Sequence, residues 1–109
     1  MKIIAVNITK TLASGLSVQL STEREWKINL VKCSKYDYVI GISRGKIEGL
    51  FKKTGENIIP LKPNRVKFDL IELDPTCIIN CFNNNSSIGL KGFVAKYIDI
   101  NCNCQDVAI

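Results

Sequence analysis

The sequence contains no histidine among its 109 residues. Catalytic triads with a histidine base, zinc sites of the HExxH type and histidine general bases are therefore excluded. No stretch approaches the roughly 20 apolar residues that a membrane helix needs, and the first nine residues are too soon interrupted by polar ones for the apolar core of a signal peptide. These absences predict a cytoplasmic protein with no membrane partner.

Cysteine is present in an odd number, which argues against a closed disulfide framework. Because cytosolic thiols stay reduced, we expect free thiols at Cys33, Cys77, Cys81, Cys102 and Cys104. The last four could bind zinc together, but the C-x2-C spacings typical of structural zinc sites are missing. We therefore expect no metal and no cofactor.

The chain is 46% hydrophobic and 23% charged, as folded soluble proteins are. Its length allows one domain, which we place at 1–100, followed by a tail at 101–109. A net charge of +5 favours an anionic partner such as nucleic acid, a nucleotide or an acidic protein surface. The alternative is a lysine-rich surface that only keeps the protein soluble.

The N-terminal part begins with two segments of strand character. Ile3–Thr9 is rich in β-branched residues, and Leu16–Ser21 alternates apolar and polar side chains. With Leu12–Gly15 as the turn between them, these segments predict a β-hairpin.

The next segment allows two interpretations. The capping-box chemistry at 21–25 could start one helix that runs through Cys33. Alternatively, Trp26–Ile28 is extended and a short helix follows, with Asn29 as its N-cap. The alternation of apolar residues around a lysine favours the second interpretation.

The middle of the chain predicts a hairpin and a further strand. Tyr38–Ile42 has the apolar run of a buried strand, the turn at 43–46 contains a glycine, and 47–51 alternates again. Glycine and prolines predict a loop over 53–64, and strict alternation predicts a strand over 65–73.

The C-terminal part predicts a short helix and a last strand. Asp74 and Pro75 form a capping pattern before a helix over 76–82 that would bury Ile78, Ile79 and Phe82. The polar run 83–87 ends this helix, and 93–100 reads as a strand. With about six strands and two short helices, the fold class is mainly β (α+β), a partial barrel.

The apolar and glycine pattern of residues 26–70 resembles the small PUA-like barrels, the superfamily that includes the EVE and ASCH domains. The residues that carry the resemblance are Trp26-x-Ile28, a short helix, Tyr38-Val39-Ile40-Gly41-Ile42, Gly45-x-Ile47-x-Gly49-Leu50-Phe51 and Arg65-Val66-Lys67-Phe68. Many members bind RNA, modified bases or nucleotides, so the resemblance implies that broad class of ligand. It transfers no individual binding residue.

Candidate ligand-binding residues combine cations with aromatic and amide side chains. Cations at the hairpin tip could contact phosphate, although glycines there are also explained by the turn alone. The single tryptophan could stack on a base or anchor the core, and an aromatic followed by asparagines could read a purine or simply end a helix. The candidates are Arg24, Trp26, Arg44, Lys46, Arg65, Lys67, Phe82, Asn83, Asn84 and Lys91.

Nothing in the sequence fixes a catalytic cluster, so we predict no enzyme activity. The favoured function is non-catalytic binding of a nucleotide or nucleic acid. The alternative is an anti-defence protein of a phage or mobile element, acting in a bacterial or phage-infected cell. It would sequester a nucleotide signal or block a host defence protein. The Ile58–Ile59 and Ile78–Ile79 pairs further predict a homo-oligomer, unless both fold back on their own chain.

Overall fold

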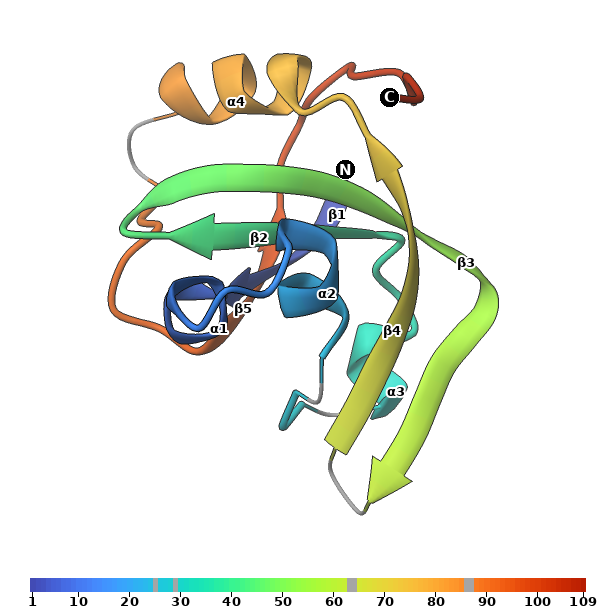
Figure 1. The fold of residues 1–109 in the computed structure, drawn as a ribbon. Helices are drawn as coiled ribbons and strands as arrows, with labels where there is room; N and C mark the ends of the chain where they lie inside the picture. Colours follow the sequence, from blue (N-terminus) through green and yellow to red (C-terminus); the bar gives the residue numbers. More distant parts are fainter. Residues whose placement is uncertain (25, 29, 63–64, 86–87) are drawn as a thin grey trace.

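The computed structural model describes residues 1–24, 26–28, 30–62, 65–85 and 88–109, and for residues 30, 55–62 and 65 it describes the backbone alone. None of the helices in this described part is long and apolar enough to cross a membrane. In chain order the elements are β1 (Lys2–Asn7), α1 (Thr9–Ala13), α2 (Val18–Glu23), α3 (Leu30–Cys33), β2 (Tyr38–Ser43), β3 (Lys46–Lys62), β4 (Arg65–Leu73), α4 (Thr76–Asn83) and β5 (Ala95–Asp99) (Figure 1).

The fold is α+β, built on one five-stranded mixed sheet in the order β4-β3-β2-β1-β5. Strands β1 and β2 are parallel, with Ile3 opposite Tyr38 and Asn7 opposite Ile42, and the other neighbours are antiparallel. The sheet stays open, so the predicted barrel is not closed. The described residues also contain five strands and four helices, where about six strands and two helices were predicted.

The missing strand is the predicted Leu16–Ser21, which lies largely in α2. The Ser17 hydroxyl accepts a 3.1 Å hydrogen bond from the Leu20 backbone N–H and so caps this helix. Alternation over six residues is too short to distinguish a strand from a helix. Here the Ser17 cap favours the helix. The predicted first hairpin is therefore wrong, and β1 takes β2 as its parallel neighbour.

The predicted loop over 53–64 is also wrong, because β3 continues to Lys62 and pairs with β4. The register shifts between Lys53 and Ile58 and again between Pro60 and Lys62. Such irregular pairing accommodates glycine and proline within a strand. The resulting β3–β4 ribbon extends beyond the rest of the sheet (Figure 1).

The other predicted elements are confirmed within a few residues: the first strand, the central hairpin, the strand at 65–73, the helix after Pro75 and the last strand. The short helix after Ile28 is confirmed as well, and Trp26 pairs with Val66 in an isolated bridge, but a hydrogen bond from the Ile28 N–H to the Trp26 carbonyl turns the chain, so the predicted extended segment 26–28 is shown only at Trp26. The predicted cap Asn29 and the loop residues 63–64 and 86–87 lie outside the described residues.

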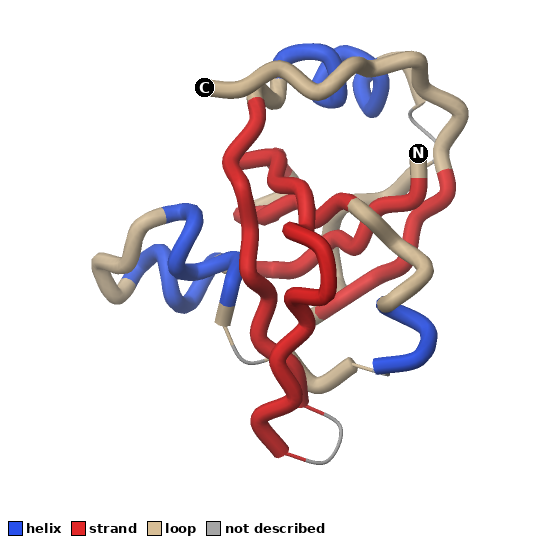
Figure 2. The backbone as a smooth tube through the Cα atoms, turned by 90° about the vertical axis from the view of Figure 1, so that its right-hand side faces the viewer, coloured by secondary structure: helices blue, strands red, loops and turns tan. Residues whose placement is uncertain are grey.

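Both faces of the sheet are buried, since alternate residues of its strands belong to two separate core clusters. Helices α1–α3 lie apart from helix α4 around the sheet (Figures 1 and 2). In β1, Ile4 and Val6 pack in one core cluster, while Ile3 and Ala5 pack in the other. Burial on both faces explains the continuous apolar run of this strand. The second cluster contains Ile78 of α4, which is completely buried.

The burial of Ile78 bears on the predicted oligomer. Its side chain packs on the sheet of its own chain, so the Ile78–Ile79 pair does not offer two free apolar side chains to a partner. The side chains of the other pair, Ile58–Ile59, lie outside the described residues.

The predicted C-terminal tail is held against α4 by two disulfides, Cys77–Cys104 and Cys81–Cys102. This corrects the expectation of reduced thiols at these four positions. The spacing explains the pairing: residues four apart lie on one side of a helix, and residues two apart lie on one side of an extended chain. The fifth cysteine, Cys33, is buried and forms no disulfide.

Two further contacts fix the end of the chain. Ala108 pairs with Leu73 in an antiparallel bridge at the end of β4. The Asp106 carboxylate accepts 2.7 Å hydrogen bonds from the Tyr38 hydroxyl and from the Lys52 ammonium group. Residues 101–109 are therefore part of the folded domain.

Candidate functional site

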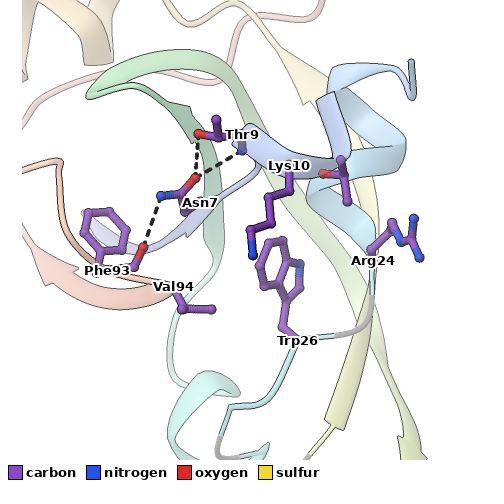
Figure 3. A pocket seen from close by; sticks show the side chains of 8 residues that line it. Asn7, Thr9, Lys10, Arg24, Trp26, Phe93 and Val94 are labelled. Atoms are coloured by element: carbon purple, nitrogen blue, oxygen red, sulfur yellow. Dashed lines mark hydrogen bonds between the residues drawn. The ribbon is translucent and has the colours of Figure 1, made fainter. Parts of the chain in front are cut away.

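A depression of about 620 Å³ lies where β1 ends, and we call it the Trp26 pocket. In open sheets, ligands bind outside the carboxyl ends of parallel strands, and β1 is one strand of the parallel pair here. The pocket is formed by three parts of the chain: the β1–α1 junction, the segment after α2, and the residues before β5 (Figure 3). Its lining residues are Asn7, Thr9, Lys10, Thr11, Arg24, Trp26, Phe93 and Val94.

Asn7 holds two walls of the pocket together (Figure 3). Its Oδ1 accepts hydrogen bonds from the backbone N–H (3.1 Å) and the hydroxyl (2.8 Å) of Thr9. Its Nδ2 donates to the Phe93 carbonyl at 3.2 Å, and its backbone N–H donates to the Val94 carbonyl at 2.9 Å. The start of α1 and the segment before β5 are thus fixed relative to each other.

Trp26 serves both the core and the pocket. Its indole N–H donates a 2.8 Å hydrogen bond to the Thr22 carbonyl, and its backbone forms both bridge hydrogen bonds with Val66. The side chain belongs to a core cluster and is 8% exposed. The interpretation of Trp26 as a core anchor is confirmed, and the small exposed part of the ring borders the pocket. Stacking on a base stays a prediction.

The charged side chains among the described lining residues are Lys10 and Arg24, both cations. Lys10 points toward the indole of Trp26, and Arg24 lies on the other side of that ring (Figure 3). Within the described part of the chain, neither cation has a carboxylate within 4 Å. The pocket thus combines two positive charges, an apolar wall and three small polar side chains, a combination that suits an organic anion.

A second depression, of about 360 Å³, adjoins the first, and Thr9 borders both. We call it the hairpin-tip depression because residues of the β2–β3 hairpin form one side of it. It is lined by Thr9, Leu12, Ala13, Ser43, Arg44, Lys46 and Glu48. Arg44 and Lys46 were predicted to contact phosphate together, and the structure places them in one depression.

Lys91 joins these two cations at the hairpin tip. Its side chain lies over Gly45, where an added Cβ would stand 2.6 Å from the Lys91 Cε. Arg44 and Gly45 form the two-residue turn with φ of 53° and 77°, the left-handed geometry of a type I′ hairpin turn. The structure thus brings together three of the predicted cations.

Four of the predicted candidates lie elsewhere. Phe82 packs in the core with 6% of its surface exposed, so its ring is not available for the predicted purine contact. Asn83 and Asn84 are exposed at the end of α4, and Lys67 is exposed on β4; none of the three lines either depression. The side chain of the remaining candidate, Arg65, lies outside the described residues.

Sequence reasoning missed six lining residues of the Trp26 pocket. They are Asn7, Thr9, Lys10, Thr11, Phe93 and Val94. The available signal was Asn7 two residues before Thr9 at the end of a strand, a pattern typical of an Asx turn. No local sequence pattern places Phe93 and Val94 in the pocket. Phe93 is 86 residues from Asn7 in the sequence and comes close to it because β5 pairs with β1 in the sheet.

The thiol of Cys33, which forms no disulfide, does not have the features of a catalytic nucleophile. Burial raises its pKa, although the neighbouring Lys53 ammonium acts in the opposite direction. A buried thiol with a raised pKa is a poor nucleophile at neutral pH. The Lys53 ammonium donates a 2.7 Å hydrogen bond to the Cys33 carbonyl, and burial lowers the pKa of this lysine. Both groups therefore serve the packing of α3 on the sheet.

Comparisons with protein-family models, curated proteins and solved structures found no match to this chain. The function therefore has to be argued from the geometry and chemistry of the site itself.

Proposed function

We propose that the Trp26 pocket binds a phosphate-bearing ligand, a nucleotide or nucleic acid, and leaves it chemically unchanged. The observation that carries the proposal is the presence of two cations, Lys10 and Arg24, beside Trp26, with no carboxylate of the described residues within 4 Å of either. Charge-assisted hydrogen bonds from such cations are the strong contacts in phosphate recognition.

The remaining lining residues fit the other parts of a nucleotide. The partly exposed ring of Phe93 offers apolar surface for a base, and the small exposed edge of Trp26 adds to it. The second N–H of the Asn7 amide can still donate to a sugar or a base edge. The hydroxyl oxygens of Thr9 and Thr11 can still accept, since their protons go to Asn7 and to the Ile8 carbonyl. A net charge of +5 adds attraction for any anion at longer range.

We include no reaction in the proposal. Among the described lining residues of the Trp26 pocket there is no carboxylate, thiol or imidazole, the usual groups of general acid–base catalysis. Groups of three or more histidine, cysteine, aspartate or glutamate side chains placed to hold a metal ion are absent from the described residues.

We also propose three further properties that the sequence suggests. They are the relationship of residues 26–70 to PUA-like domains, the cytoplasmic location, and the homo-oligomer. The α+β class is compatible with the first, although the sheet is open. The large exposed apolar side chains Leu20, Val31 and Ile71 are compatible with a partner subunit.

The proposal is tested by fluorescence polarisation with labelled single strands, duplexes and nucleotides at low salt. The variant Lys10→Gln/Arg24→Gln should weaken binding about tenfold or more, since each charge-assisted hydrogen bond contributes about 1.5–3 kcal/mol. The control Lys27→Gln/Lys35→Gln removes the same charge from two exposed positions outside both depressions. Equal weakening in both variants, or no binding by the wild type, would reject the proposed site.

A further inference from the structure

We infer that the bound ligand continues past Thr9 into the hairpin-tip depression, so that the site accommodates two nucleotides joined by a phosphodiester. This inference rests on the proposed function and narrows its ligand class. A free dinucleotide and a nucleic acid strand share this chemistry.

The first argument is the continuity of the two depressions. Thr9 lines both of them, so the two depressions are neighbours, and a ligand that spans both would pass over Thr9. Their volumes, about 620 Å³ and 360 Å³, both lie in the range of small-molecule sites. Each depression has its own cations, and one ligand with two phosphates would use both sets.

The second argument is the charge of the hairpin tip. Arg44 and Lys46 line the depression, and Lys91 lies over the turn between them. Within the described part of the chain, none of the three has a carboxylate within 4 Å. Glu48 is the one acidic side chain among the described lining residues, which therefore carry two cations and one carboxylate, and Lys91 adds a third cation at the turn.

The third argument is the backbone of Arg44. It is the one non-glycine residue with positive φ in the described part of the chain. Asparagine or glycine fits this turn position with less strain. Residues with strained backbone are found most often at ligand-binding sites, where the surrounding structure keeps them in that conformation. In our proposal, the guanidinium of Arg44 contacts the second phosphate.

The test compares dissociation constants for a 5′-phosphorylated deoxydinucleotide and the matching 5′-mononucleotide, measured by isothermal titration calorimetry on the full chain. The wild type should bind the dinucleotide at least about tenfold more tightly, the gain expected from one further charge-assisted contact. In Arg44→Asn/Lys46→Gln this ratio should fall toward one. The control Lys27→Gln/Lys35→Gln should keep the wild-type ratio. Glu48→Gln should raise it, because it removes the opposing carboxylate.

This experiment distinguishes a failure of the inference from a failure of the proposed function. If the mononucleotide binds but the wild-type ratio is near one, or if Arg44→Asn/Lys46→Gln keeps the full ratio, the inference is wrong and the proposed function stands. If neither ligand binds, the proposed function fails and the inference fails with it. An octanucleotide identifies the source: tighter binding than the dinucleotide indicates a nucleic acid strand, and equal binding indicates a free dinucleotide. Both of these results support the inference.

Discussion

The side chain of Lys91 lies across Gly45, and a Cβ built on this glycine would stand 2.6 Å from the lysine Cε. This contact joins two parts of the chain that are 46 residues apart, the β2–β3 turn and the segment before β5. Gly45 also has a φ of 77°, which side chains rarely adopt. The tip of the hairpin is thus shaped by a backbone geometry that few residues tolerate.

Replacement of Gly45 by alanine should destabilise the protein by about 1 kcal/mol or more, since alanine is strained at this φ and its methyl group displaces Lys91. Gly89→Ala is the matched control, because no atom lies within 4 Å of its added Cβ and its φ is not positive. We expect the control to stay within about 0.5 kcal/mol of the wild type in urea denaturation. Equal stability of the two variants would contradict the geometry of the turn.

Arg44→Asn should have opposite effects on stability and on binding. Asparagine tolerates the left-handed region better than arginine, so the free energy of unfolding should rise by up to about 1 kcal/mol. Ligand binding should weaken, because a cation of the hairpin-tip depression is lost. Urea denaturation and calorimetry on the same preparation measure both effects. A variant that is less stable than the wild type would show that the side chain of Arg44 has a structural role.

The cysteines offer a test of the C-terminal segment. Under native conditions a thiol reagent should find no reactive group, because Cys33 is buried and the other four cysteines form disulfides. After denaturation without reductant it should find one thiol per chain. Three or five thiols would show that one or both bridges are absent in the isolated protein, as a reducing cytosol would favour.

The bridges should also stabilise the fold. They close sequence separations of 27 and 21 residues, and the chain-entropy model gives about 3–4 kcal/mol for a single bridge of that span. The second bridge lies within the loop of the first and should add less. The double variant Cys77→Ser/Cys104→Ser should therefore have a clearly lower midpoint of urea denaturation than the wild type. An unchanged midpoint would contradict a structural role of the bridge.

Asp106 predicts a small pH dependence of stability. Hydrogen bonds from Lys52 and Tyr38 hold the pKa of this carboxyl below its usual value. Because the folded pKa is the lower one, the contribution is complete above the unfolded pKa and is lost as the pH falls through the folded pKa. The pair is solvent-exposed, so Asp106→Asn should cost less than about 1 kcal/mol at pH 7. Urea denaturation should show the difference shrinking below pH 4; a difference that grows there would have the wrong sign.

The sequence predicted those elements whose signals are local. The central hairpin was recognisable from Gly45 in the turn and from apolar runs on both sides, and β4 from its strict alternation. α2 was missed because its alternation is short and the Ser17 cap competes with it. The continuation of β3 was missed because its pairing with β4 outweighs Gly55 and Pro60.

The site was predictable only in part, for the same reason. Arg24, Trp26, Arg44, Lys46 and Lys91 were identified as cations or an aromatic near turns and strand ends. Asn7 and Phe93 come together because β1 and β5 are neighbours in the sheet, a relationship that no short pattern contains. The disulfides were missed because the assumed cytosolic environment outweighed the spacing of the four cysteines.

The central claim is that a phosphate-bearing ligand occupies the pocket beside Trp26. Since Trp26 is the single tryptophan of the chain, its fluorescence reports on this pocket directly. The most direct measurement is a titration of that fluorescence with nucleoside 5′-monophosphates and, in parallel, with the corresponding nucleosides. The account predicts saturable change with the phosphorylated ligands, much weaker change with the nucleosides, and loss of the change in Lys10→Gln/Arg24→Gln. Fluorescence that responds equally to nucleosides and nucleotides, or to neither, would contradict it.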